Sequence, residues 1–360
     1  MVTLLFLPVF ALINGSMPID STPRQGGIQV HSGFIIPHSP DLKLLAQARP
    51  LSIDLTYSQI ALSRNAYERC NCFARVGGYA GYTAFGNPAE LGRAYGTGGF
   101  FEPIIHPQNR LYFSFRTTAG LVWLTRIYDA ETNPRNTFFG ASLSGLLALS
   151  VSAHYRLTNQ LHLSAIGRYN HISNGGTRQP NRGMNFPTVG LGLLYTVNPI
   201  AFPNPGQWPR QTVSGLFTKR IMLFGSVRTL PKTATLPEQV GWSWGFTATA
   251  GYRISRFHAL TGGVEFVNDG YLRQQLRRAG LVIRHQQVGV LGGHEAWLGR
   301  YRFATHLGWN LLQPGVLPGS HFFQRYQLLY TIRNQYQIGI GLRARLNVAE
   351  GFDVRAGMAF

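Results

Sequence analysis

The sequence has little charge, few acids, two cysteines and no long apolar run beyond its N-terminus. Charged side chains make up 13% of the 360 residues, whereas soluble domains typically carry about 25%. No interior stretch reaches the ~18 unbroken apolar residues that a membrane-spanning helix needs. Cys70 and Cys72 lack neighbouring histidines and do not make a zinc site, although they suit either a disulfide or two free thiols. We expect no metal and no other cofactor.

Acidic residues are especially scarce, since 14 acids stand against 33 lysines and arginines and give a formal charge of +19. A balance this basic often indicates nucleic acid binding. Here the basic residues are scattered, and neither a DNA-reading helix nor an RNA-binding sequence motif is present. The phosphates of lipopolysaccharide or phospholipid are therefore the expected anionic partner, and no nucleic acid partner is expected.

The N-terminus carries an apolar run from Leu4 to Ile13, followed by small and polar residues. This length suits the apolar region of a secretory signal peptide and is too short to span a bilayer. The usual basic residue before the run is missing. We expect residues 1–16 to be a signal peptide and residues 17–360 to form a single barrel domain, with a buried first strand as the alternative reading of the N-terminus.

What the sequence does have is a strict alternation of apolar and polar residues. It is clearest in 141–156, 242–254 and 336–346. This pattern indicates strands with one apolar and one polar face. At 10–14 residues the strands are long enough to cross a bilayer at a tilt, and lipid tolerates no open sheet edge. The sequence therefore predicts an all-β fold: a transmembrane antiparallel up-and-down β-barrel of roughly 12–16 strands in a bacterial outer membrane.

Connection lengths give the barrel a direction. Short turns are expected at 156–160, 255–257, 292–296 and 333–336. Long connections are expected at 129–137, 173–184, 268–280 and 313–323. Outer-membrane barrels have short periplasmic turns and longer external loops, so 173–184 is expected at the external rim. The Pro-rich link 198–211 is an exception among the short connections, and the final strand, "GFDVRAGMAF", resembles the C-terminal signature of bacterial outer-membrane proteins.

One polar stretch, "YNHISNGGTRQPNRGMNFP" at 169–187, interrupts this pattern. By strand parity His171, Ser173 and Asn185 all fall on the apolar, lipid-facing side near the external rim. Polar groups facing hydrocarbon are costly unless they bond to one another. A histidine beside a serine is the minimum for an activated nucleophile, and a third group is needed to orient the imidazole. The alternative is a simple rim turn built on Asn174 and Gly175.

The segment "HISNGGTRQPNRGMN" resembles the signature of the lipid A 3-O-deacylase family (PagL type, grouped with acyloxyacyl hydrolase-like barrels). Its members carry His-x-Ser-Asn-x-Gly, then Pro-Asn-x-Gly and an acid. The resemblance implies an outer-membrane barrel with a serine esterase site on its lipid-facing surface, which removes an ester-linked acyl chain from lipid A. It implies Ser173 as nucleophile and His171 as base. The implied oxyanion hole comprises Asn174, Gly175 and Gly176.

Two arginines, Arg178 and Arg182, lie in the same loop. Their guanidinium groups suit the phosphates of lipid A, although solvated loop arginines are an equally simple reading.

The sequence departs from the family pattern where the acid should stand, because that position holds Asn185. An amide oxygen accepts a hydrogen bond from the imidazole but offers no charge to the imidazolium, and in a serine protease the same swap costs about 10⁴ in kcat. Either Asn185 serves as a weaker orienting group, which its parity favours, or Asp129 or Glu131 replaces it. A deacylase that has lost its activity is a third possibility.

The chain is about twice as long as the family's typical eight-stranded members. Two other functions stay open beside the deacylase. One is a passive outer-membrane pore, and the other is a phospholipase. The residues expected to line such a pore are His162, Arg168 and Asn170.

Overall fold

The computed structural model describes residues 22–208, 217–233, 235–315, 321–333, 335–345 and 348–360, and these form an almost entirely β structure. The expected signal peptide, 1–16, lies outside the described residues. None of the helices in the described part of the chain is long and apolar enough to cross a membrane.

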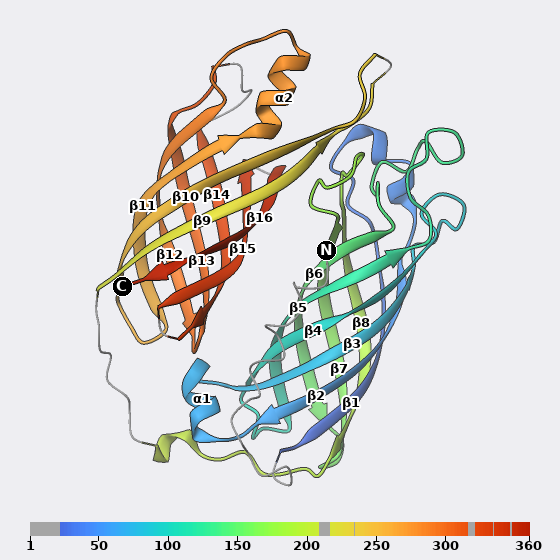
Figure 1. The fold of residues 1–360 in the computed structure, drawn as a ribbon. Helices are drawn as coiled ribbons and strands as arrows, with labels where there is room; N and C mark the ends of the chain where they lie inside the picture. Colours follow the sequence, from blue (N-terminus) through green and yellow to red (C-terminus); the bar gives the residue numbers. More distant parts are fainter. Residues whose placement is uncertain (1–21, 209–216, 234, 316–320, 334, 346–347) are drawn as a thin grey trace. The chain divides into compact units, whose positions relative to one another are not determined.

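Among the described residues, sixteen antiparallel strands close into two barrels of eight (Figure 1). The first barrel comprises β1 (Arg24–Gly33), β2 (Leu51–Ala61), β3 (Phe73–Ala84), β4 (Arg93–Ile105), β5 (Leu111–Leu124), β6 (Leu143–Arg156), β7 (Leu161–Ser173) and β8 (Met184–Val197). The second comprises β9 (Phe217–Leu230), β10 (Gln239–Arg253), β11 (His258–Asp269), β12 (Gln286–Leu298), β13 (Tyr301–Leu312), β14 (Phe322–Ile332), β15 (Tyr336–Arg345) and β16 (Val348–Ala359). Two short α-helices, α1 (Arg64–Cys70) and α2 (Gly270–Arg278), lie in the connections, with 3-10 turns at Pro40–Leu42, Leu45–Gln47 and Pro205–Gln207.

The strand count falls within the expected range, but the strands close as two barrels and not as the single barrel expected. In the first, β8 returns to pair with β1, and in the second, β16 pairs with β9. The chain accordingly divides into two compact units, Met1–Asn174 with Pro180–Trp208 and Gly175–Gln179 with Pro209–Phe360. Alternation defines the two faces of each strand but not its partner, so it does not show where a sheet closes. The Pro-rich stretch after β8 is the connection between the barrels.

The outward faces of both barrels are apolar. In the first, Val189 is 73% exposed and Leu191 64%, and in the second Trp242 is 70% exposed. Apolar side chains exposed in such number around a closed sheet suit lipid and not water. The architecture therefore points to an outer-membrane protein.

The interior of the first barrel is polar and filled. Glu102 is fully buried and accepts hydrogen bonds from Arg75 (2.6 Å), Arg116 (2.8 Å) and Ser114 (2.6 Å). An eight-stranded barrel has an interior just wide enough for its own side chains. This network pairs the buried carboxylate with two arginines and helps to fill the lumen.

The second barrel follows the same plan with its own charges. Arg325, 1% exposed, lies between Glu265 and Asp353, with nitrogen–oxygen distances of 2.6 Å to each. Asp353 also accepts a hydrogen bond of 2.7 Å from Arg355. Both barrels therefore fill their cores with buried ion pairs, in which loss of either partner would leave an uncompensated charge.

The three residues expected to line a pore do point into the first barrel, but each is bound there. Arg168 pairs with Asp54, and the side-chain amide of Asn170 donates to the Phe186 carbonyl at 3.0 Å. His162 and the Tyr112 hydroxyl lie 3.0 Å apart. The wide aqueous channel on which the pore hypothesis rested needs a barrel of about sixteen strands, and the structure divides those strands between two narrow barrels.

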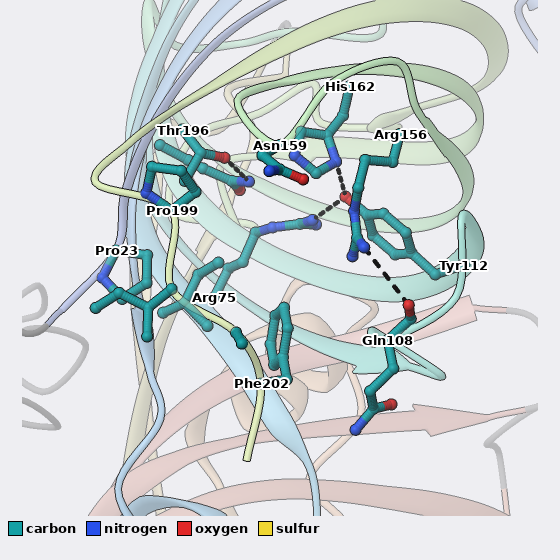
Figure 2. A pocket seen from close by; sticks show the side chains of 14 residues that line it. Pro23, Arg75, Gln108, Tyr112, Arg156, Asn159, His162, Thr196, Pro199 and Phe202 are labelled. Carbon is teal, nitrogen blue, oxygen red and sulfur yellow. Dashed lines mark hydrogen bonds between the residues drawn. The ribbon is translucent and has the colours of Figure 1, made fainter. Parts of the chain in front are cut away.

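A cavity of about 330 Å³ lies at the short-turn end of the first barrel, far along β7 from Ser173 (Figure 2). Arg75 reaches it from the barrel wall and donates to Tyr112 Oη at 2.8 Å. Pro199 and Phe202, on the chain leaving β8, line its opposite side. The cavity lies at the mouth of the filled lumen.

The other end of the first barrel is capped by its long loops. Phe138 and Phe139, between β5 and β6, are 0% and 1% exposed and pack in an apolar cluster with Leu42 and Leu91. The Phe138 carbonyl accepts a hydrogen bond of 3.1 Å from the Gly183 amide, just before β8. The cap thereby fixes the chain that enters β8.

The buried carboxylate gives a test of the filled lumen. Glu102→Gln leaves Arg75 and Arg116 without a countercharge and is expected to lower the free energy of unfolding by about 3–5 kcal/mol. Denaturant unfolding in lipid vesicles measures the change. Glu131→Gln removes the same charge from an exposed loop and is the matched control, expected to change stability by less than about 0.5 kcal/mol. Equal effects of the two substitutions would contradict the structure.

Candidate functional site

The candidate site lies where β7 ends and β8 begins, on the outward face of the first barrel. His171 and Ser173 share that face with Tyr169, which is 44% exposed, while Asn170 and Ile172 are buried inside at 5% and 2%. Across the loop, Asn185 is in phase with the exposed Val189. The parity expected from the sequence is therefore confirmed for His171, Ser173 and Asn185.

His171 and Asn185 form a cross-strand pair. They stand directly opposite each other in the β7–β8 register, and His171 Nδ1 lies 2.7 Å from Asn185 Oδ1. Because an amide oxygen only accepts hydrogen bonds, the Nδ1–H donates to it. The proton is thereby held on Nδ1, which leaves the lone pair of Nε2 available to act as a base.

The two acids considered as substitutes for Asn185 belong to the loop between β5 and β6, and in the described part of the chain neither forms a hydrogen bond with His171. Asp129 Oδ1 accepts hydrogen bonds from the Thr132 amide (2.8 Å), the Thr132 hydroxyl (2.9 Å) and the Glu131 amide (3.1 Å). These bonds, that of the Thr132 amide foremost, hold the pKa of Asp129 below its usual value. The Glu131 side chain is exposed. The group that the structure brings to the imidazole is Asn185.

Asn181, a residue without a predicted role, completes the polar cluster. Its side-chain Nδ2 donates to Ser173 Oγ at 2.9 Å, and its Oδ1 accepts from the Asn174 amide at 3.2 Å. The residue belongs to the Pro-Asn-x-Gly part of the quoted segment. The asparagine of this motif was the one sequence feature that pointed to Asn181. Strand parity applies only within strands, so it could not predict where a loop side chain points.

Gly183 lies against both His171 and Ser173. Its φ is +68°, a left-handed conformation that residues with a side chain adopt only with strain. A methyl group at this position would stand 3.2 Å from His171 Cε1 and 3.5 Å from Ser173 Cβ. The loop at Gly183 therefore passes beside both the imidazole ring and the serine side chain.

Strand β6 flanks the serine on the side away from β8. In the β6–β7 register Gly145 stands opposite Ser173, and Leu147 stands opposite His171. Gly145 has no side chain to cover the hydroxyl, and Leu147 is 43% exposed on the apolar face. An apolar chain lying along the outside of the barrel would meet Ser173 here.

The expected oxyanion residues are placed only in part. Asn174 belongs to the first compact unit, and its amide donates to Asn181. Gly175 and Gly176 both have left-handed φ values, +68° and +82°. They fall with Arg178 in the segment Gly175–Gln179, which groups with the second unit, so their role stays a prediction.

Arg182, the other arginine expected to bind phosphate, is half exposed, and its guanidinium lies 3.8 Å from the Asp41 carboxylate. An exposed pair at this distance is weak. The expected role of Arg182 in binding phosphate stays a prediction.

Within the described part of the chain, no group of three or more His, Cys, Asp or Glu side chains is arranged to hold a metal ion. Cys70 and Cys72, for which the sequence left two states open, form a disulfide at the end of α1.

The fold and the cluster together define a class: an outer-membrane type of β-barrel that presents a serine, a histidine and an asparagine on its lipid-facing side. Residues 71–193 match the family model for lipid A 3-O-deacylase (PagL), and residues 218–360 match that for the acyloxyacyl hydrolase C-terminal domain. The chain therefore belongs to this PagL-type, acyloxyacyl hydrolase-like family, as the sequence resemblance indicated.

Several solved structures are similar to parts of the chain. The outer-membrane enzyme PagL shares 14% identity over 46% of this chain and 97% of its own, with a TM-score of 0.34. Neisserial surface protein A shares 13% over 48% and 96%, also at 0.34. The monoaromatic hydrocarbon channel TodX, as a deletion mutant, shares 9% over 97% and 92%, at 0.19. Scores this low add nothing to the family assignment. None of the curated proteins matches the sequence.

Two glycines on the outward side give a matched test of the site's packing. Gly183→Ala is expected to lower the free energy of unfolding by about 1–2 kcal/mol, because alanine at a left-handed φ is strained. Gly167→Ala, where a methyl group would meet nothing within 4 Å, is expected to change it by less than about 0.5 kcal/mol. Denaturant titration in vesicles measures both. A Gly183→Ala protein as stable as the Gly167→Ala protein would show that Gly183 does not have the left-handed conformation described.

Proposed function

We propose that this protein is an outer-membrane serine esterase that removes an ester-linked acyl chain from lipid A. The observation that carries the proposal is the His171–Asn185 hydrogen bond of 2.7 Å on the outward face, beside a serine whose hydroxyl is held by Asn181. Membership of the lipid A 3-O-deacylase family supports the substrate class.

In the first half of the reaction, Ser173 Oγ attacks the ester carbonyl and its proton passes to His171 Nε2. The tetrahedral intermediate collapses, and the same proton goes to the leaving sugar hydroxyl, while the acyl group stays on the serine. In the second half, water attacks the acyl-enzyme and gives a proton to Nε2. Nε2 passes this proton to Ser173 Oγ as the bond between the acyl group and the serine breaks and the fatty acid leaves. Asn185 keeps the imidazole in the required tautomer throughout.

The developing negative charge on the carbonyl oxygen needs hydrogen-bond donors. Asn181 Nδ2 is 2.9 Å from Ser173 Oγ. In the tetrahedral intermediate Oγ and the oxyanion are bonded to the same carbon, so Nδ2 lies close to where the oxyanion forms. We assign Asn181 Nδ2 as a donor, together with the amides of Gly175 and Gly176 that the family resemblance implies. Asn174, whose amide donates to Asn181 Oδ1 at 3.2 Å, holds the Asn181 side chain in place. Preorganised donors of this kind contribute about 10²–10³ in kcat each.

The outward position of the serine suits a lipid substrate. The acyl ester of lipid A lies at the junction of sugar and hydrocarbon, which is the level of the barrel's external rim. An acyl chain in the outer leaflet meets the apolar face along Leu147 and Val189, which are 43% and 73% exposed. The substrate then reaches Ser173 by diffusion within the membrane, without extraction into water.

Removal of either reacting side chain is expected to abolish activity. Expression of the wild-type protein is expected to shift lipid A by the mass of one hydroxyacyl chain, and Ser173→Ala or His171→Ala is expected to restore the original lipid. Mass spectrometry of lipid A is the measurement, with Ser164→Ala, inside the barrel, as control. An unchanged lipid A profile with inserted wild-type protein would argue for a lapsed enzyme, and released phospholipid acyl chains would indicate a phospholipase.

The uncharged orienting residue gives a second prediction. Asn185→Leu keeps a similar volume but cannot accept from Nδ1, and is expected to lower kcat by roughly 10²-fold or more. Asn185→Glu supplies the carboxylate of the family signature and is expected to raise kcat above wild type, because it stabilises the imidazolium. Rates on lipid A in mixed micelles measure both. Full activity of Asn185→Leu would show that His171 does not depend on this bond.

A further inference from the structure

Helix α2 and the chain after it form an amphipathic segment on the second barrel, at the end where the long connections lie (Figure 1). Asp269 caps its first turn by accepting from the Leu272 amide at 3.0 Å. Leu272 and Leu276, each 5% exposed, bury one face of the helix, which packs on β9 and β10. The helix is therefore fixed to the barrel and presents its other face outward.

That outward face is basic and unneutralised. Arg273 and Arg277 lie one turn apart and are exposed, as is Arg284 after the helix, and none of the three forms an ion pair with a described residue. The segment 270–285 contains no acid. The adjoining acid, Asp269, is already engaged by Arg228 at 2.8 Å. The three free guanidinium groups therefore form an anion-attracting surface.

An apolar patch adjoins these arginines. Leu281, Val282 and Ile283 are consecutive and 39%, 96% and 41% exposed. Three exposed aliphatic residues in a row on an otherwise charged connection are unfavourable in water. They become favourable where a basic surface meets the apolar boundary of a membrane.

The position of α2 along the barrel fits such a boundary. Trp242 and Trp244 are 70% and 54% exposed at the start of β10, and aromatic residues of this kind mark the membrane interface in β-barrels. Gly270, the first residue of α2, packs so closely on Trp242 that a methyl group there would fall 1.9 Å from the Trp242 carbonyl oxygen. The helix thus begins at the level of the aromatic girdle, where lipid phosphates lie.

We propose that α2 and Leu281–Ile283 form a lipid A-binding surface on the second barrel, separate from the esterase site. Arg273, Arg277 and Arg284 bind the phosphates of lipid A, and Leu281–Ile283 enter the adjoining layer of acyl chains. Guanidinium groups suit phosphate oxygens. A ligand that satisfies both halves of the surface must carry phosphate next to hydrocarbon, which favours this anionic glycolipid over a nucleic acid or an acidic protein.

The test uses the full-length Ser173→Ala protein in detergent micelles, so that bound lipid is not hydrolysed and failure of the esterase proposal does not affect the result. Binding of fluorescent bisphosphorylated lipid A at physiological salt is compared with that of phosphatase-treated lipid A. The test variant is Arg273→Gln, Arg277→Gln and Arg284→Gln combined. The control combines Arg256→Gln, Arg300→Gln and Arg333→Gln, which removes the same charge from the short turns at the other end of the barrel.

The test variant is expected to bind bisphosphorylated lipid A at least about tenfold more weakly, and the control is expected to bind as the parent does. Dephosphorylated lipid A is expected to bind the parent as weakly as the test variant binds the intact lipid. Val282→Asp, which keeps every arginine, is expected to weaken binding as well. Unchanged binding by the test variant, an equal loss in the control, or indifference to the phosphates would overturn the proposal. Heat-modifiable electrophoretic mobility verifies that each variant is folded.

Discussion

The structure depends on the cost of placing polar groups against hydrocarbon. A closed antiparallel sheet satisfies every backbone group, and its strict alternation sends one set of side chains to lipid and the other to the lumen. His171, Ser173 and Asn185 are on the lipid side of that division, where each needs a partner. The bond between His171 and Asn185, at 2.7 Å, meets this need and at the same time orients the imidazole. The same hydrogen bond therefore satisfies two polar groups that face lipid and prepares the imidazole for the proposed chemistry.

The two barrels use their interiors and exteriors in different ways. Inside, buried acids and arginines such as Glu102 with Arg75, and Arg325 with Asp353, pair at 2.6 Å and fill the space. A lumen filled in this way leaves little room for a lipid. Recognition of a membrane substrate then falls to the outer surface, where the first barrel presents a cluster of hydrogen-bonding side chains and the second presents arginines beside exposed aliphatic residues.

Strand parity predicted the β-barrel class, the strand number and the outward direction of the three site residues, because a period of two follows directly from backbone geometry. It did not predict closure into two barrels, since strand pairing is decided by contacts remote in sequence. Asn181 was missed because loop geometry has no such period. The state of Cys70 and Cys72 was left open for a similar reason: their spacing permits either form, and the fold settles on the disulfide.

The central claim is that Ser173 is an activated nucleophile on the outside of the barrel. Incubating the folded protein in lipid micelles with a long-chain alkyl fluorophosphonate, followed by peptide mass mapping, tests it most directly. The account predicts one covalent adduct on Ser173, formed rapidly in the parent and lost when His171 is replaced by alanine. Absence of an adduct from correctly inserted protein, or modification of a different serine, would contradict it.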